Sequence, residues 1–268
     1  MDIIRFKKIL EFSEANRNMI STKIQDFYKQ IGMENSKELH NILQLARQLF
    51  QKQGYIIVEM PFKDGEIGAV CYKGDGLGYA MVNSSCPKVN VNFALCHEIY
   101  HLLYQEKGFK KIVELYMNEH YYEHKDEMAA NLFAGMLLMP EDSFRFMFRK
   151  FAGEEEDTLS ILALLMSYFE VPYMAALIRC YELKLLDSGE LLAKLMNVNR
   201  EEIRNIFSKL WLDESVLEAT KKDDYHKLER FVIYMGYMYQ KEGYLNKVTL
   251  DKAIRNMRSI YTKIKGES

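Results

Sequence analysis

The sequence is poor in cysteine, and its few cysteines are widely spaced. Cys71, Cys86, Cys96 and Cys180 include no Cys-x-x-Cys pair. This spacing argues against a zinc ribbon and against a disulfide-stapled scaffold, both of which need closely grouped cysteines. We therefore expect buried, reduced thiols.

Long apolar runs and a strong net charge are also absent. The longest apolar stretches, 132–139 and 161–166, fall far short of the roughly 20 residues that span a bilayer. The start of the chain carries Asp2 and Glu11 among mixed charges and lacks the apolar core of a secretory signal. A formal net charge of −2 over 268 residues gives no bulk indication of nucleic-acid binding. We expect a globular cytoplasmic protein without a membrane segment.

The residue pattern changes at Tyr55. Residues 3–53 have helical spacing and predict two or three helices. The next segments, YIIVEM, IGAVCYK and GYAMVN, are short, rich in β-branched and aromatic residues, and separated by the turn signals KDGE and GDG. They predict three short antiparallel strands.

Helical spacing returns after Pro87. It predicts helices over 93–105, 123–139 and 142–151, and the acidic run at 153–157 is the clearest internal boundary. Beyond it the pattern is helical throughout, with starts expected near residues 158, 172, 199, 224 and 249.

His97, Glu98 and His101 form an H-E-x-x-H pattern on the helix predicted over 93–105. Positions four apart lie on one helix face, so both imidazoles can bind one ion while Glu98 points beside it toward a water molecule. A bound metal lowers the pKa of such a water from 15.7 to about 7, and a neighbouring carboxylate can move its proton to a leaving amine. Two helical histidines can also be ordinary core or surface residues, so a third ligand is needed to distinguish these readings.

Glu127 is the candidate third ligand. It lies 26 residues after His101, near the start of a strongly apolar helix, where a carboxylate favours a metal partner. The alternative is a solvated acid stabilised by the helix dipole. Asn131, one turn later on the same face, is a candidate to hydrogen-bond the free nitrogen of a ligand histidine. The ligand types favour Zn²⁺, although manganese or iron can occupy the same donors.

These residues resemble the ImmA/IrrE family of metallopeptidases. The H-E-x-x-H pattern is followed, after an insertion, by E-x-x-A-N-x-F-A-x-x-L-L-M-P from Glu127 to Pro140, and the resemblance covers roughly residues 40–150. It implies a zinc peptidase with metal ligands His97, His101 and Glu127 and with Glu98 as general base and acid. Family members typically cut helix-turn-helix repressors, so the resemblance implies a DNA-binding repressor as the protein substrate.

The chain departs from many relatives at Tyr100, which stands where they have a small residue; we expect it to change packing and not metal ligation. The span 102–126 is long and predicts a lid or a substrate wall. Four of its side chains can donate to an oxyanion, and no spacing rule selects one of them: His120, Tyr121, Tyr122 and His124. The strand GYAMVN either pairs with an extended peptide substrate or is an ordinary sheet edge.

The stretch after the acidic run has a helix, a turn at Val171 and Pro172, and a second helix. This shape is typical of a helix-turn-helix, but Arg179 is the only cation of its second helix and acidic residues lie nearby. We therefore expect a packing module without direct nucleic-acid binding. The aromatic row farther along is expected to be core, with partner docking or a sensor role as the alternative: Trp211, Tyr234, Tyr237, Tyr239 and Tyr244. The basic segments 221–222 and 255–265 are expected to be solvated helix faces.

The sequence thus predicts an α+β fold that is mostly helical, with a small three-stranded antiparallel sheet beside the H-E-x-x-H helix and an all-helical C-terminal region. The expected divisions are a zincin-like metallopeptidase domain with N-terminal helices at 1–153, a degenerate helix-turn-helix-like element at 154–187 and a helical bundle at 188–268. The oligomeric state stays open.

The predicted function is zinc-dependent hydrolysis of a peptide bond in a protein regulator. One alternative is a metal-containing regulator or antitoxin-like partner that binds without cutting, although a purely structural metal site has no need of Glu98 and usually takes four protein ligands. A DNA-binding regulator would need a basic recognition surface, which the second helix of the helix-turn-helix-like element lacks.

Overall fold

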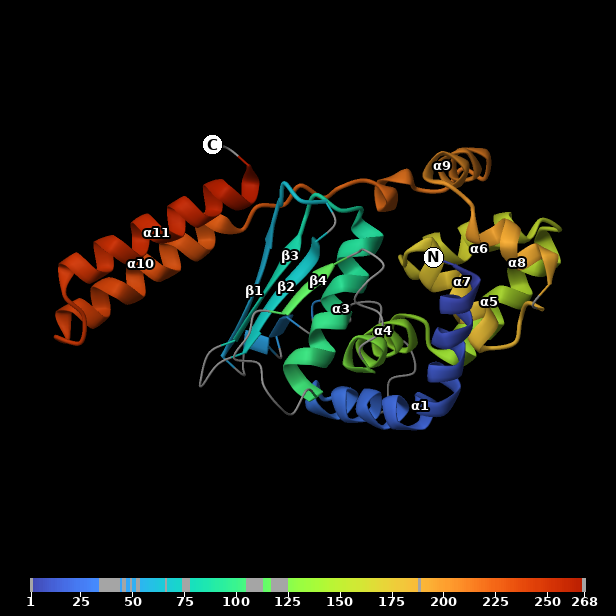
Figure 1. Ribbon diagram of the computed structural model, residues 1–268, viewed down its shortest axis with the longest axis horizontal. Helices are drawn as coiled ribbons and strands as arrows, with labels where there is room; N and C mark the ends of the chain where they lie inside the picture. The colour runs from blue at the N-terminus through green and yellow to red at the C-terminus, as the bar shows by residue number, and fades with distance from the viewer. Residues whose placement is uncertain are drawn as a thin grey trace.

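The computed structural model of the protein describes residues 2–33, 44, 47–48, 50–51, 54–65, 67–73, 78–104, 113–116, 125–187 and 189–266. Figure 1 shows a small sheet with most of the helices on one side of it and, on the other side, a helical hairpin that extends away from it. The elements, in chain order, are α1 (Ile3–Gln30), β1 (Tyr55–Met60), β2 (Ile67–Lys73), β3 (Gly78–Asn83), α3 (Lys88–Tyr104), β4 (Val113–Tyr116), α4 (Lys125–Leu138), α5 (Glu141–Glu154), α6 (Thr158–Phe169), α7 (Tyr173–Glu182), α8 (Glu190–Met196), α9 (Arg200–Lys209), the 3₁₀ helix η2 (Glu214–Leu217), α10 (Tyr225–Lys241) and α11 (Lys247–Lys265).

The sheet has the strand order β1-β3-β2-β4. The three predicted strands are present, but the prediction of a purely antiparallel sheet is wrong. β3 runs antiparallel to β2 and parallel to β1, with Tyr55 opposite Gly78 and Met60 opposite Asn83. The reason is that β3 lies between β1 and β2, so the strands on either side of the KDGE segment are not neighbours. Alternating hydrophobicity predicts strands, but it does not encode their order or direction.

The fourth strand lies inside the span 102–126, for which the sequence predicts a lid or a substrate wall. β4 pairs antiparallel with β2, with Val113 opposite Cys71 and Tyr116 opposite Ile67, and it forms the edge of the sheet opposite β1. Residues 105–112 and 117–124 of that span lie outside the described residues. A part of the span predicted to form a lid or a substrate wall is therefore a strand of the sheet.

Helix α3 packs on one face of the sheet, and α4 packs on α3 (Figure 1). Small and branched side chains, among them Ala69 and Val82 from the strands and Ala94 and Leu95 from the helix, form the core between the sheet and α3. Helix α1 lies against α4, and side chains such as Phe27 and Phe133 fill the second core there. Helix α3 is consequently surrounded by protein along most of its length.

Helices α5 to α9 share a separate apolar core, which contains Phe144, Leu162 and Leu177. No single helix in the described part of the chain is both long and apolar enough to cross a membrane; α6 and α7 meet the length and composition together, but they are bent by 107°. Glu170 ends α6 in the left-handed conformation, with φ of 48°, and this residue makes the turn before Pro172.

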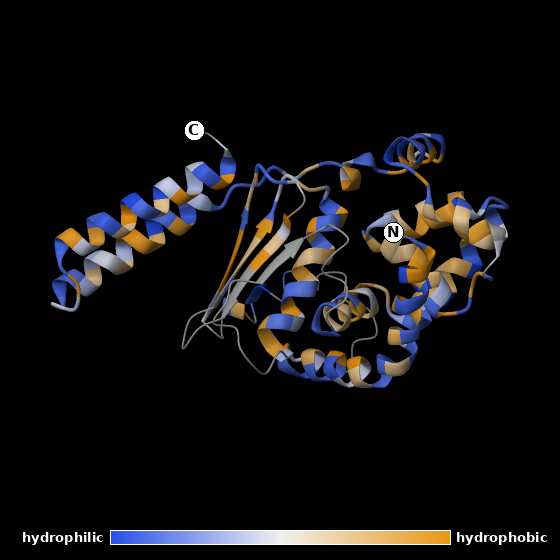
Figure 2. Ribbon diagram, viewed as in Figure 1, coloured by the Kyte–Doolittle hydropathy of each residue, from blue (hydrophilic) through white to orange (hydrophobic). Residues whose placement is uncertain are grey.

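The regular structure described beyond residue 188 is helical, in agreement with the predicted fold class. Its arrangement differs from a single compact body, because α10 and α11 form a hairpin that extends away from the sheet (Figures 1 and 2). The aromatic side chains that the sequence placed in a core are largely exposed: Tyr234 by 62%, Tyr237 by 60%, Tyr244 by 80% and Trp211 by 95%. Helical spacing identifies a face, but it does not tell whether the protein itself covers that face.

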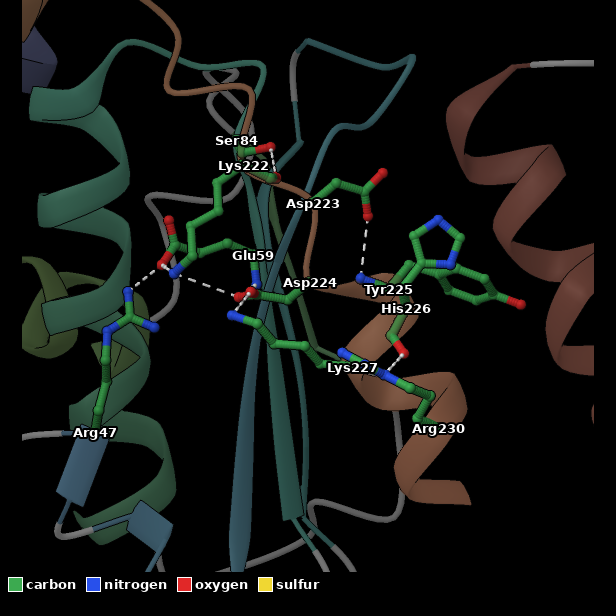
Figure 3. Close-up of polar contacts among 10 residues, drawn as sticks. All are labelled: Arg47, Glu59, Ser84, Lys222, Asp223, Asp224, Tyr225, His226, Lys227 and Arg230. Atoms are coloured by element: carbon green, nitrogen blue, oxygen red, sulfur yellow. Dashed lines mark hydrogen bonds and ion pairs between the residues drawn. The ribbon is translucent and has the colours of Figure 1, made fainter. Parts of the chain in front are cut away.

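The base of the hairpin is attached to β1 by charged and backbone contacts (Figure 3). The buried Glu59 carboxylate accepts from Arg47 and from Lys222, whose Nζ lies 2.8 Å from Oε1. The amide of Asp224 donates to the Glu59 carbonyl at 2.7 Å, and the Glu59 amide donates to Asp224 Oδ2 at 3.3 Å. The segment entering α10 is therefore tied to a strand more than 160 residues earlier in the chain.

Candidate metal centre

Helix α3 supplies both histidines of the site from its buried interior. It begins after Pro87, whose carbonyl accepts from the amides of Asn90 and Val91. Because the sheet covers one side of α3 and α4 covers another, His97, Glu98 and His101 are each 0% exposed. Polar side chains buried so completely need partners, since desolvation without a compensating interaction costs about 1–3 kcal/mol in proteins.

The structure brings together the three side chains that the sequence selected as metal ligands. His97 Nε2 lies 2.9 Å from His101 Nε2 and 3.1 Å from Glu127 Oε2, and His101 Nε2 lies 3.4 Å from Glu127 Oε1. One donor atom from each residue lies within 4.8 Å of the others. Residues from α3 and α4 thus form one compact cluster.

This cluster fits a metal ion of the zinc type. Donors that bind Zn²⁺ tetrahedrally at about 2.0–2.1 Å lie about 3.3 Å from one another, and the three separations in the cluster are close to that value. Two imidazoles and one carboxylate are the donor set of several catalytic zinc sites, which keep the fourth position open. Among the described residues, this is the one group of three histidine, cysteine or acidic side chains with such geometry.

Asn131 makes the hydrogen bond that the sequence suggested. His97 Nδ1 donates to Asn131 Oδ1 at 2.9 Å, which fixes the tautomer and leaves the Nε2 lone pair directed toward Glu127 and His101. Asn131 lies one turn after Glu127 on α4. This helix therefore supplies both the third candidate metal ligand, Glu127, and the residue that orients the ligand His97.

Glu127 is held as an anion although it is mostly buried. Its side chain is 12% exposed, which differs from the solvated first-turn acid considered as the alternative. Burial alone would raise its pKa, but hydrogen bonds and charge from His101 and His97 outweigh burial and hold the pKa of Glu127 well below its usual range. The neighbouring Cys96 is different: complete burial raises the pKa of its thiol, so it stays neutral.

Tyr100 packs beside the histidines. Its ring contacts that of His101 at 5.9 Å and that of Phe133 at 5.8 Å between centroids, and Lys23 of α1 lies 4.7 Å from its centroid. The side chain is 4% exposed. These contacts agree with the expected role in packing. No sequence pattern predicts the contribution of α1, since Lys23 lies 77 residues from Tyr100 and no local periodicity connects them.

Two other expectations about substrate binding have different outcomes. β3 lies between β1 and β2 and has a partner on both sides, so it is neither a sheet edge nor free to pair with a peptide. The candidate oxyanion donors His120, Tyr121, Tyr122 and His124 lie outside the described residues.

The family comparison agrees with this geometry. Residues 50–181 match the model of a peptidase family described as the IrrE N-terminal-like domain. The matched range begins just before β1 and ends in α7, so it contains the whole sheet, both helices of the metal centre and the bent pair α6 and α7. No curated protein matches the chain significantly. Together with the cluster of His97, His101 and Glu127, the match shows that residues 50–181 form a peptidase domain of the ImmA/IrrE family.

Proposed function

We propose that the protein is a zinc-dependent endopeptidase of the cytoplasm that hydrolyses a peptide bond in a transcriptional regulator, specifically a DNA-binding repressor of the helix-turn-helix type. The observation that carries the peptidase part is the convergence of His97, His101 and Glu127 within 4.8 Å inside the matched domain. The choice of a repressor as substrate is supported by the resemblance of the motif to repressor-cleaving relatives.

The residues of the candidate metal centre would have distinct roles. His97, His101 and Glu127 would hold the ion, and Asn131 would keep His97 in the tautomer that binds it. A bound zinc ion would supply Lewis acidity to the substrate carbonyl and to a water molecule. Burial of the donors on α3 lowers the local dielectric, which strengthens these interactions.

Glu98 would act as the proton carrier. It would accept a proton from the attacking water as the new carbon–oxygen bond forms, and it would give that proton to the amine nitrogen as the carbon–nitrogen bond breaks. Its position next to His97 in a fully buried part of α3 supports this role. A purely structural metal site would have no use for such a base.

The helix-turn-helix-like pair does not offer a basic surface of its own. Arg179, the cation of α7, is 2% exposed and pairs with Glu182 at 2.9 Å. Its guanidinium also donates to the carbonyl of Met139 at 3.1 Å. This burial supports a packing role for α7 and a protein, rather than nucleic acid, as the molecule acted on.

The test incubates the purified, zinc-loaded protein with the repressor encoded beside its gene and compares the wild type with Glu98→Gln. We expect the wild type to cleave the repressor and Glu98→Gln to lose at least a hundredfold in rate, since general base catalysis contributes about 10²–10⁴-fold. If both variants relieve repression equally while the repressor stays full length, the non-catalytic binding partner is the correct function.

Metal content separates the ligands from the base. By elemental analysis, His97→Ala and Glu127→Ala should lose stoichiometric zinc, whereas Glu98→Gln should keep it. Near-stoichiometric zinc in Glu127→Ala would remove the third ligand from the proposal. Loading the metal-free wild type with zinc, manganese or iron tests which metal restores activity.

A further inference from the structure

One face of α10 is exposed along its whole length and has an unusual composition. The side chains at 227, 230, 231, 234, 237, 238 and 241 recur every three or four positions, so they lie on one side of the helix. All of them are exposed. We call this set the α10 outer face: Lys227, Arg230, Phe231, Tyr234, Tyr237, Met238 and Lys241.

The opposite side of α10 packs on α11, which turns the outer face away from its partner helix. Gly236 lies so close to α11 that a Cβ there would be 2.2 Å from Leu250 Cδ1. The ion pair between Arg258 and Glu229 measures 2.6 Å, and the rings of Tyr225 and Tyr261 stack at 3.7 Å. The aromatic residues of the outer face remain exposed, Phe231 by 50% and Tyr234 by 62%.

The composition of this face differs from that of an ordinary solvated helix. Solvated faces usually mix cations and acids at positions four apart. The α10 outer face has three cations, three aromatic side chains, one methionine and no acid. Residues 225–265 contain nine lysines and arginines against three acids, a formal charge of +6, while the whole chain has −2. The remainder of the chain therefore has −8, so the positive charge is concentrated on the hairpin.

The charge and the aromatic content together select the type of partner. A second copy of this hairpin would bring two positive surfaces together, which repulsion disfavours. Nucleic-acid binding commonly uses about 6–10 phosphate contacts, whereas this face has three cations, and Lys227 already lies 2.8 Å from Asp224 Oδ1. Tyrosine, phenylalanine, methionine and arginine are the residues enriched where proteins bind proteins.

We infer that the α10 outer face is a docking surface for a protein partner that presents an acidic amphipathic helix. Carboxylates of the partner would face Arg230 and Lys241, and its apolar side chains would cover Phe231, Tyr234 and Met238. This binding site goes beyond the proposed peptidase activity and does not depend on it.

The hairpin is anchored firmly enough to hold such a partner at a defined place beside the sheet. The amide of Lys63 donates to the Ile264 carbonyl at 2.7 Å, at the end of α11. Asp224, at the start of α10, is bonded to both the amide and the carbonyl of Glu59 on β1 (Figure 3). Both helices are thus fixed at the base, and the outer face lies beyond it.

The experiment titrates the full-length protein into a fluorescein-labelled synthetic peptide with glutamate and leucine at amphipathic helical spacing, and it follows fluorescence anisotropy. We expect binding that weakens at least tenfold in Phe231→Ala/Tyr234→Ala and in Arg230→Glu/Lys241→Glu. Tyr168→Ala is the matched control, because Tyr168 is a 48% exposed aromatic residue of α6, and it should change the dissociation constant less than twofold.

Several results would overturn the inference. These are no binding by the wild type, equal binding of a peptide with lysine in place of glutamate, or a double variant that binds the peptide as tightly as the wild type does. Tighter binding of a single-stranded oligonucleotide would assign the face to nucleic acid. A dimer in sedimentation that Phe231→Ala/Tyr234→Ala abolishes would assign it to a second copy. Circular dichroism checks that the variants are folded, and Tyr234→Ala alone repeats the test with a milder change.

Discussion

At the residue scale, Asn131 of α4 orients the imidazole of His97 for metal binding. Its Oδ1 accepts the Nδ1 proton at 2.9 Å, so the Nε2 lone pair faces the cluster without a competing proton. Replacing Asn131 with alanine should weaken zinc binding about 10–100-fold, as is typical when the partner of a ligand histidine is removed. Competition against a colorimetric chelator measures this affinity. Asn131→Asp keeps an acceptor oxygen and should bind more tightly than the alanine variant; equal affinities for wild type and Asn131→Ala would contradict the role.

Most of the candidate site could be predicted from the sequence because its members lie on two short helical patterns. The spacing of His97 and His101 places them on one face, and Glu127 with Asn131 repeats that relation on the next helix. What the sequence could not supply is the contact between Tyr100 and α1, because residues 23 and 100 meet only through tertiary packing. Local periodicity contains no information about which distant helix covers a given face.

At the element scale, the hairpin depends on the close approach of its two helices at Gly236. Because a Cβ there would lie 3.2 Å from Leu250 Cγ as well as 2.2 Å from its Cδ1, Gly236→Val should force α10 and α11 apart at a cost of about 1–3 kcal/mol. Hydrogen exchange should accelerate in α10 and α11 and stay unchanged in α3 and α4. Gly153→Val in α5 is the control, since a Cβ there would meet no atom within 4 Å.

The attachment of the hairpin should depend on pH through Asp224. Burial alone would raise its pKa, but hydrogen bonds from Lys227 and the Glu59 amide, with the charge of Lys222, lower it below its usual value. Because the pKa of Asp224 is lower in the folded than in the unfolded protein, its carboxylate stabilises the fold at pH values above the unfolded pKa of about 3.9. This stabilisation is lost as pH falls through the folded pKa.

Asp224→Asn should therefore unfold at a lower urea concentration than the wild type at pH 7, and the difference should shrink steadily below about pH 4. Asp187→Asn, at an exposed position, is the comparison and should leave the urea midpoint at pH 7 unchanged. A difference in urea midpoint between the wild type and Asp224→Asn that is as large well below about pH 4 as at pH 7 would contradict an electrostatic origin.

The strands illustrate the limit of prediction for elements. The bounds of β1, β2 and β3 match the three segments selected from the sequence, because alternation and turn residues act locally. The insertion of β3 between its two predecessors and the pairing of β4 with β2 depend on contacts across the sheet. The exposed tyrosines of α10 show the same limit for helices, since an amphipathic pattern is satisfied by a partner protein as well as by a core.

At the scale of the whole molecule, Arg179 connects three parts of the chain. It pairs with the Glu182 carboxylate on α7 and donates to the Met139 carbonyl after α4, and the backbone carbonyl of the same Glu182 accepts from Arg17 of α1 at 3.3 Å. Arg179→Ala would leave the Glu182 carboxylate buried without its cation, and we expect a loss of about 3–5 kcal/mol in the free energy of unfolding.

Urea denaturation measures this loss, and the double variant Arg179→Met/Glu182→Leu should recover part of it because no buried charge then lacks a partner. A change below about 1 kcal/mol in Arg179→Ala would contradict a structural role for the guanidinium. Arg145→Ala, on the partly exposed surface of α5, is the matched control and should cost less than about 1 kcal/mol.

The placement of α1 has a consequence for biosynthesis. Helix α1 precedes α4 and α7 in the chain and packs against both, and the hydrogen bond from Arg17 to Glu182 joins residues 165 positions apart. A nascent chain leaving the ribosome must expose the apolar side of α1 until α4 and α7 have been made, because these helices are its binding surfaces. Such late, long-range closure slows folding and leaves the unfinished chain prone to aggregation.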